Sequence, residues 1–213
     1  MLLAGDIGGT KTRLGLFETG SLRRPVRTDT LPSADFGSLE ELCRRFLEVG
    51  DGAHGVAAAA LGVPGPVVDG RAKTTNLPWE VDGERLGEAL GIDTVRLFND
   101  LVAVGRAVPM LEDDDIRTIV VPEIGGDPNT SDNPDSTDDP DSPQPPVAIV
   151  APGTGLGIAY GVDGPGGYRV VASEGGHADF APIGVLQEDM LRFMREKVGR
   201  VSYERVCSGS GLP

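Results

Sequence analysis

Two glycine-rich turns carry the residue types that could bind phosphate groups. Residues 5–10 read Gly-Asp-Ile-Gly-Gly-Thr and residues 152–157 read Pro-Gly-Thr-Gly-Leu-Gly, each between two apolar runs typical of strands. Glycine permits positive φ and lets backbone N–H groups approach a ligand without a Cβ in the way. Successive N–H groups in such a turn form a concave anion-binding surface. The pair predicts a nucleotide whose phosphates are held between two lobes.

Glycine-rich turns also occur without any ligand. A single glycine hairpin is more often only a hairpin, and glycine is abundant here, with 31 in 213 residues. Neither turn is a Walker P-loop, because Thr10 stands where that motif requires glycine and a strand follows where it requires a helix. Residues 153–157 are not a dinucleotide fingerprint, because the third glycine comes too early. Both exclusions favour a strand–turn–strand phosphate clamp.

A second set of polar residues has the chemistry of a hydroxyl-binding site. Asn99 and Asp100 stand where a predicted strand ends and a helix begins, which is the usual ligand-binding edge of an α/β sheet. Helix capping is the simpler alternative for such a pair. Glu174 and His177 flank a Gly-Gly turn, and Glu204 follows on a short helix; structural or solvated roles are open for each of them.

The apolar patterns predict alternating strands and helices that would position these residues. The predicted elements are a hairpin at 1–19, a helix capped by Ser38, strands at 55–61, 71–75 and 94–98, helices at 83–90 and 100–111, a second hairpin at 147–162, a strand at 168–172, and helices at 185–198 and 202–207. This alternation indicates an α/β fold.

Composition excludes several classes of protein. The formal net charge is −14, and residues 112–146 hold eleven acidic residues against Arg117 alone, so most of the acidity is local. The Asp-, Pro- and Ser-rich stretch 123–146 predicts a disordered acidic insertion. The acidic balance argues against a nucleic-acid partner.

The chain has no apolar run of membrane-spanning length, no basic leader and two widely spaced cysteines, which together predict a cytoplasmic protein.

Taken together, the motifs resemble those of bacterial glucokinases, hexokinase-like enzymes with the two-lobed actin-like ATPase (ribonuclease H-like) fold. The resemblance is carried by Gly-Asp-Ile-Gly-Gly-Thr, Val-Pro-Gly-Pro-Val, Thr-Asn-Leu-Pro-Trp, Asn-Asp, Gly-Thr-Gly-Leu-Gly and Glu-Gly-Gly-His-Ala-Asp-Phe-Ala-Pro, in that order. It covers nearly the whole chain apart from 123–146. The cysteine-rich zinc motif of the related repressor/open-reading-frame/kinase group does not occur in the sequence.

The resemblance implies a role for each matching residue. Asp100 would be the catalytic base, and the sugar hydroxyls would be bound by Asn76, Asn99, Asp100, Glu174, His177 and Glu204. The ATP phosphates would be bound by Gly5, Asp6, Ile7, Gly8, Gly9, Thr10, Gly153, Thr154 and Gly155. Asp6 would reach Mg²⁺ through water. The implied substrates are glucose and ATP, with no nucleic acid, no membrane, and a homodimer left open.

The resemblance also predicts that the chain is an N-terminal portion. Its expected parts are a small lobe at 1–110, the insertion at 123–146 and an incomplete large lobe at 147–213, because family members continue into a glycine-containing adenosine motif beyond this length. Alternatives remain in the sequence: a kinase of another hexose, such as mannose, fructose or an N-acetylated sugar, a non-catalytic sugar-binding fragment, or an actin-like structural ATPase.

Overall fold

The chain divides into two compact units, residues 1–103 and 104–213. The computed structural model describes residues 1–49, 55–74, 77, 79–119, 146–165, 167–209 and 211. The predicted insertion at 123–146 lies outside the described residues except for Pro146. The expected lobe limits, 1–110 and 147–213, stay predictions.

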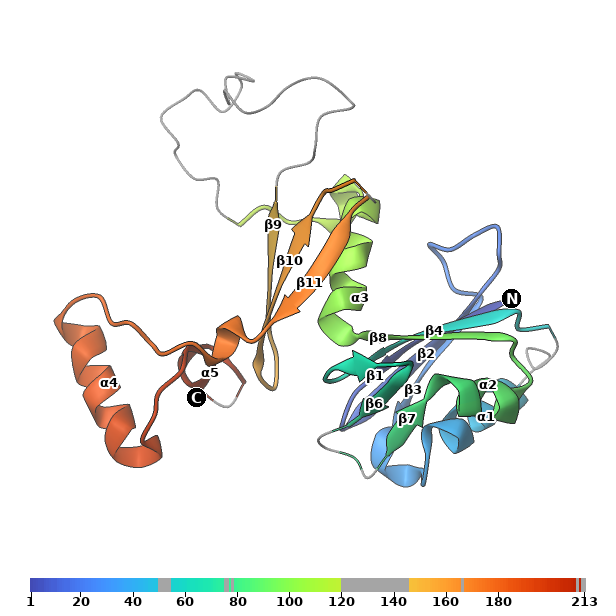
Figure 1. Ribbon diagram of the computed structural model, residues 1–213, viewed down its shortest axis with the longest axis horizontal. Coiled ribbons are helices and arrows are strands. Elements are labelled where there is room, and N and C mark those ends of the chain that lie inside the picture. Colours follow the sequence, from blue (N-terminus) through green and yellow to red (C-terminus); the bar gives the residue numbers. More distant parts are fainter. Residues whose placement is uncertain are drawn as a thin grey trace, which may run out of the picture. The chain divides into compact units, whose positions relative to one another are not determined.

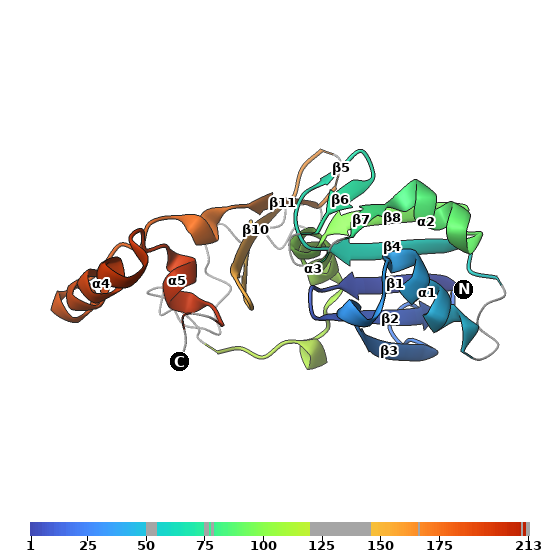
Figure 2. The same ribbon diagram turned by 90° about the horizontal axis from the view of Figure 1, so that it is seen from below.

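A five-stranded mixed sheet forms the centre of the first unit (Figure 1), and its strand order, β3-β2-β1-β4-β8, can be followed in Figure 2. Its strands are β1 (Leu2–Ile7), β2 (Lys11–Phe17), β3 (Arg27–Pro32), β4 (Ala58–Val63) and β8 (Thr94–Asn99). The predicted hairpin is confirmed, because β1 and β2 pair antiparallel from Leu2 opposite Phe17 to Ile7 opposite Thr12. β1, β4 and β8 run parallel to one another.

β4 begins three residues later than the predicted strand at 55–61. Gly55 has a φ of 93°, which an extended strand does not use. Its carbonyl oxygen accepts a 2.8 Å hydrogen bond from the N-terminal ammonium of Met1, and the Ala57 N–H donates to the Met1 carbonyl oxygen. This stretch therefore anchors the start of the chain before the regular ladder begins.

Two helices cover one face of this sheet. α1 (Leu39–Glu48) is capped by Ser38, whose Oγ accepts from the Glu41 N–H, as predicted. α2 (Gly83–Leu90) begins after the capping carboxylate of Asp82 and ends at Gly91, whose φ is 68°. Figure 2 shows α1 in front of the sheet. The core between these layers contains Leu3, Ile7, Leu14, Leu16, Leu39, Leu42, Phe46, Leu61, Val63 and Leu86.

A small sheet of three strands, β5 (Val67–Val68), β6 (Arg71–Lys73) and β7 (Glu80–Asp82), leads into α2. The strand predicted at 71–75 ends at Lys73 in the structure, and Thr75 lies outside the described residues. α3 (Asp100–Ala107) is shorter than the predicted 100–111 helix. A 3₁₀ turn at Val108–Met110 follows, because Pro109 lacks the N–H that a continued α-helix needs.

The second unit contains a three-stranded antiparallel sheet in the order β11-β10-β9 (Figure 1). Its elements are β9 (Val147–Pro152), β10 (Leu156–Val162), β11 (Arg169–Ser173), α4 (Val185–Val198) and α5 (Tyr203–Cys207). The second hairpin and the helix at 185–198 are therefore confirmed. Among the described residues, the buried apolar side chains of this unit are Ile149, Ala159, Leu191 and Val201.

No helix within the described parts of the chain is long and apolar enough to cross a membrane.

We predict that Gly87→Ala destabilises the protein although alanine is the better helix former. Alanine favours a helix over glycine by about 1 kcal/mol. A Cβ at Gly87, however, would lie 2.7 Å from the backbone carbonyl oxygen of Ile92 and 3.3 Å from Val95 Cγ2. We expect a net loss of about 1–3 kcal/mol in the free energy of unfolding, measured by urea denaturation.

Gly83→Ala, in the same helix, is the matched control. Its Cβ would meet no atom closer than 3.4 Å, so that variant should equal or exceed the wild type in stability. A Gly87→Ala protein as stable as the Gly83→Ala protein would show that the close approach to Ile92 has no energetic weight.

Candidate active site

The carboxyl ends of three parallel strands meet at one edge of the first unit. Asp6 on β1 pairs with Gly62 on β4, and Gly62 pairs with Phe98 on β8. Gly62 has no side chain between the outer two strands, and a Cβ there would lie 3.6 Å from the Cα of Asp100. This register brings Asp6 and Asp100 to the same edge, where α/β sheets bind ligands.

The electrostatics of Asp6 reflect this proximity. Partial burial and the neighbouring negative charge of Asp100 raise the pKa of the Asp6 carboxyl, and the guanidinium of Arg13 opposes them. A carboxylate such as that of Asp6, whose charge is disfavoured by burial and by a neighbouring carboxylate, is stabilised when a cation or a proton reaches it.

Asn99 and Asp100 are held in place by hydrogen bonds at the start of α3. Asn99 Oδ1 accepts from the Val102 N–H at 3.2 Å, so the capping role expected as the simpler alternative is present. Asn99 Nδ2 donates to the Gly65 carbonyl oxygen at 3.1 Å and to Asp100 Oδ1 at 3.0 Å. Asp100 Oδ1 also accepts from the Leu101 N–H at 2.8 Å. Both of these bonds to Asp100 use Oδ1, so Oδ2 has the greater remaining capacity to accept a proton.

The first glycine turn joins β1 to β2 beside these carboxylates. The Gly8 N–H donates to the Lys11 carbonyl oxygen at 3.1 Å, and a Cβ at Gly8 would lie 2.6 Å from that oxygen. Glycine is therefore required at position 8. The side chain of Ile7 is buried in the core, and a Cβ at Gly5 would collide with Leu14 and Leu61. Of these two residues, only the backbone could face a phosphate.

The second glycine turn, between β9 and β10, is held by the segment around α5. The Gly153 N–H donates to the Gly155 carbonyl oxygen at 2.8 Å, and the Gly209 N–H donates to the Gly153 carbonyl oxygen at 2.7 Å. Glu204 Oε2 accepts from the Leu156 N–H at 2.9 Å. A Cβ at Gly155 would lie 2.6 Å from that carboxylate oxygen, so glycine at this position permits the approach of Glu204.

Glu174, His177 and Glu204 lie together in the second unit. His177 Nε2 is 3.7 Å from Glu174 Oε2, and His177 Nδ1 is 3.8 Å from Glu204 Oε1. The Glu174 side chain is 90% exposed, whereas that of Glu204 is 26% exposed. Gly176 in the intervening turn is buried, and a Cβ there would overlap the Leu156 carbonyl oxygen. The turn can therefore form only with glycine at 176.

Sequence reasoning missed the residues that support these groups. Arg200 donates to the His177 carbonyl oxygen and to Asp179 Oδ1, both at 2.7 Å, and the Tyr203 N–H donates to the Ala178 carbonyl oxygen. Ser33 contacts the first glycine turn from outside the hairpin. An arginine before a helix and a serine after a proline carry no sequence signal of these contacts.

The structure thus forms two groups from the predicted site residues. The first unit brings together Asp6, the turn 8–10, Asn99 and Asp100. The second unit brings together the turn 153–155, Glu174, His177 and Glu204. Asn76 lies outside the described residues. Within the described part of the chain, no three His, Cys, Asp or Glu side chains are grouped so as to hold a metal ion by themselves.

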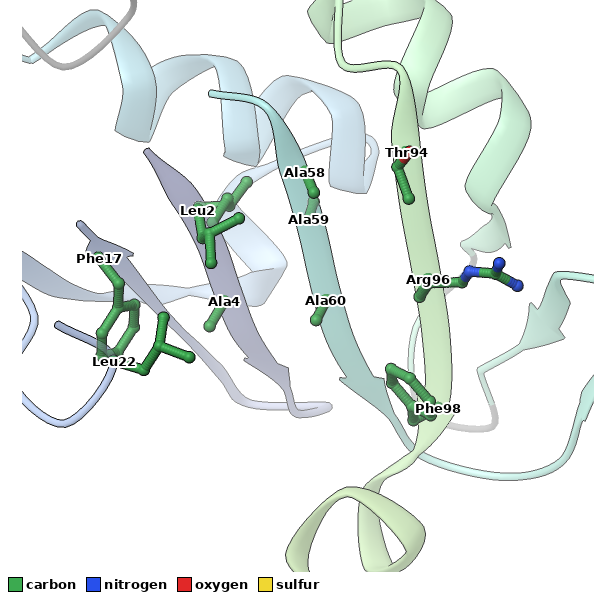
Figure 3. Close-up of a pocket in the computed structure, with 11 residues that line it drawn as sticks. Leu2, Ala4, Phe17, Leu22, Ala58, Ala59, Ala60, Thr94, Arg96 and Phe98 are labelled. Atoms are coloured by element: carbon green, nitrogen blue, oxygen red, sulfur yellow. The ribbon is translucent and has the colours of Figure 1, made fainter. Parts of the chain in front are cut away.

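An apolar cavity of about 320 Å³ lies elsewhere in the first unit. Figure 3 shows its lining side chains on β1, β2, β4 and β8, including Ala4, Phe17, Ala60 and Phe98. Arg96 is the one charged residue in this lining. A sugar needs several hydrogen-bonding groups, so this cavity is not the predicted hexose site.

Comparison with known proteins supports the resemblance read from the motifs. The sequence model of the family described as Glucokinase matches residues 3–213. A glucokinase of Nostoc punctiforme is 37% identical over 216 residues, which cover all of this chain and 58% of the relative. A glucokinase of Synechocystis is 37% identical over 223 residues, covering 99% of this chain and 58% of the relative. The chain therefore spans less than two thirds of the length of these curated relatives.

Solved structures agree with the fold that the resemblance implies. A glucokinase from an Antarctic psychrotroph superposes with a TM-score of 0.74 at 30% identity, over 99% of this chain and 61% of that one. A Balamuthia mandrillaris glucokinase, solved in complex with glucose, has a TM-score of 0.67 at 23% identity, over 99% and 60% of the two chains. The α/β, actin-like ATPase fold is confirmed, and the chain belongs to the glucokinase family.

Proposed function

We propose that this chain serves the ATP-dependent phosphorylation of glucose to glucose 6-phosphate. The observation that carries the proposal is the placement of Asp100 beside Asp6 and the glycine turn 8–10, in a chain of the glucokinase family. Phosphoryl transfer requires a base at the attacking hydroxyl and donors around the phosphates. The first unit supplies residues of both kinds at one edge of its sheet.

Asp100 would act as the general base. As the terminal hydroxyl oxygen of glucose attacks the γ-phosphorus, its proton would pass to Asp100 Oδ2. The bond between the γ-phosphorus and the β–γ bridging oxygen breaks, and ADP leaves with that oxygen. The hydrogen bonds from Asn99 and the Leu101 N–H to Oδ1 would fix the orientation of the carboxylate during the transfer.

The backbone N–H groups of the two glycine turns would hold the ATP phosphates. Mg²⁺ in proteins is bound by one or two carboxylates together with substrate phosphates and water. Asp6 fits that requirement, because its carboxyl lies at the same edge as the turn and near Asp100. When bound, the ion would neutralise charge on the phosphates.

The hydroxyl groups of glucose would be bound by Asn76, Asn99, Asp100, Glu174, His177 and Glu204. Carboxylates and amides accept hydrogen bonds from individual hydroxyls, and a buried polar group left unpaired by the wrong sugar is costly. The support in the second unit is the approach of Glu174 and Glu204 to the two nitrogens of His177. We place the protein in the cytoplasm, without a nucleic-acid partner, and leave a homodimer open.

We predict that Asp100→Asn abolishes phosphoryl transfer while retaining most of the glucose affinity. The amide keeps the size of the carboxyl and its hydrogen bond to the Leu101 N–H but cannot accept the hydroxyl proton. Glucose-dependent ADP release with Mg-ATP measures turnover, and calorimetry measures sugar binding. Asp93→Asn, at an exposed position before β8, is the matched control. Turnover of Asp100→Asn above a tenth of that of the control would reassign the base.

We predict that Asp6→Asn is more stable than the wild type at neutral pH and inactive. The folded-state pKa of Asp6 is raised, so its contribution to stability is full below its unfolded pKa of about 4 and is lost as pH rises through the higher folded value. The melting-temperature advantage of the variant should therefore grow between about pH 4 and pH 7. A pH-independent difference between the two proteins would refute this account.

We predict that glucose is phosphorylated with a higher kcat/KM than mannose, fructose or N-acetylglucosamine. The measurement is the rate of ADP release with each sugar alone and in competition. A higher kcat/KM for another hexose would support a sugar kinase but would show that glucose is not its preferred substrate. Hydrolysis of ATP at the same rate without any sugar would favour the structural ATPase.

A further inference from the structure

Ser33 joins the first glycine turn from outside the hairpin that forms it. It is fully buried and begins a short 3₁₀ turn, Ser33–Asp35, directly after β3. Its Oγ donates to the Gly8 carbonyl oxygen at 2.7 Å, and its backbone N–H donates to the Thr10 carbonyl oxygen at 3.0 Å. Two carbonyl groups of the turn are thus fixed by one residue.

Thr12 completes this arrangement from β2. It is also fully buried, and its Oγ1 lies 3.0 Å from Ser33 Oγ. A serine hydroxyl has one hydrogen, and that of Ser33 is directed to the Gly8 carbonyl oxygen, so Thr12 must be the donor to Ser33. The relay runs from the Thr12 hydroxyl through the Ser33 hydroxyl to the Gly8 carbonyl, and each bond polarises the next.

The direction of the Gly8 carbonyl determines the direction of the next amide. In a planar trans peptide, the C=O of one residue and the N–H of the following residue point in opposite directions. Because the Gly8 carbonyl points to Ser33, the Gly9 N–H points away from it. The Thr10 carbonyl likewise points to the Ser33 N–H, so the Lys11 N–H, in the same peptide, points away from Ser33. The buried hydroxyls of Ser33 and Thr12 therefore lie on one side of the turn, and the N–H groups of Gly9 and Lys11 point to the opposite side.

The Gly8 carbonyl has an alternative partner. An ordinary two-residue hairpin would close with a bond from the Lys11 N–H to the Gly8 oxygen. In the structure, the Gly8 N–H donates to the Lys11 carbonyl oxygen. The Gly8 carbonyl oxygen, in contrast, accepts from the Ser33 hydroxyl and not from the Lys11 N–H. The Ser33 hydroxyl thus competes with closure of the hairpin.

In the second glycine turn, too, a donor from outside the turn binds the carbonyl oxygen of a turn glycine. The Gly153 carbonyl oxygen accepts from the Gly209 N–H at 2.7 Å, so the Thr154 N–H points away from that contact. In each unit, an outside donor holds the carbonyl of a turn glycine and thereby orients the amide that follows it.

We propose that Ser33 is a positioning residue for phosphate binding: its hydroxyl holds the Gly8 carbonyl so that the Gly9 N–H faces the nucleotide phosphates. This inference rests on the proposed function of the turn. Loss of the hydroxyl leaves the Gly8 oxygen without its buried donor, and the peptide can rotate toward the Lys11 N–H. The effect should fall on nucleotide affinity and leave glucose affinity unchanged.

The test uses ¹⁵N–¹H spectra of the full chain, titrated with Mg-ATP, together with calorimetric binding of Mg-ATP and of glucose. In Ser33→Ala, we expect the Gly9 resonance to move before nucleotide is added, and the Kd for Mg-ATP to rise about tenfold. Thr12→Val keeps the bond from Ser33 to Gly8, so its effects should have the same direction and be smaller. Ser33→Thr keeps the hydroxyl and should restore most of the nucleotide affinity.

Ser38→Ala is the matched control, because it removes a serine hydroxyl that caps α1 and does not touch the turn. It should lower the melting temperature without moving the Gly9 resonance or the Kd for Mg-ATP. An unchanged Kd in Ser33→Ala, or an equal rise in Ser38→Ala, would overturn the positioning role. If the Gly9 and Thr10 resonances of the wild type do not shift when Mg-ATP is added, the proposed phosphate site is wrong, and the positioning role of Ser33 is wrong with it.

Discussion

The parallel register of β1, β4 and β8 is the constraint on which the first group of site residues depends. It places Asp6 and Asp100 at one edge, and Gly62 contributes no side chain between them. Partial burial, and after it the nearby charge of Asp100, raise the pKa of the Asp6 carboxyl, so the charged form of Asp6 has an electrostatic cost at this edge. A protein that only needed to fold would gain by removing one of these charges. Retaining both is reasonable when a proton and a cation must be received at that edge.

The second unit depends on a single carboxylate in a comparable way. Glu204 accepts from the Leu156 N–H with Oε2 and faces His177 with Oε1, so one side chain connects the glycine turn with the group expected to bind sugar. Glycine at 155 and at 176 makes these close approaches possible, because a Cβ at either position would occupy space taken by Glu204 or by Leu156. The glycines of this region are thus explained by packing as well as by ligand access.

Local signals predicted the elements that have clear ends. α2 and α4 agree with the predicted ranges, since the first has a capping Asp82 and both end at a glycine with positive φ. The helix that begins at Asp100 is shorter than predicted. The apolar periodicity of the sequence extends past Pro109, but the helical hydrogen bonds do not, because proline has no N–H. β4 starts later than predicted because Gly55 has a positive φ, and Gly55 and Ala57 bond to Met1 before the regular ladder begins at Ala58.

The sequence by itself determined the α/β class, the two glycine turns and the family to which the chain belongs, because turn glycines and motif order are local properties. Only the tertiary structure decided which of these residues lie together. It uses Asn99 as a helix cap, joins Glu204 to Leu156, and directs Ser33 to the Gly8 carbonyl across 25 positions of sequence. Such contacts depend on strand register and on the direction of single peptide groups, and neither is encoded in the spacing of residue types.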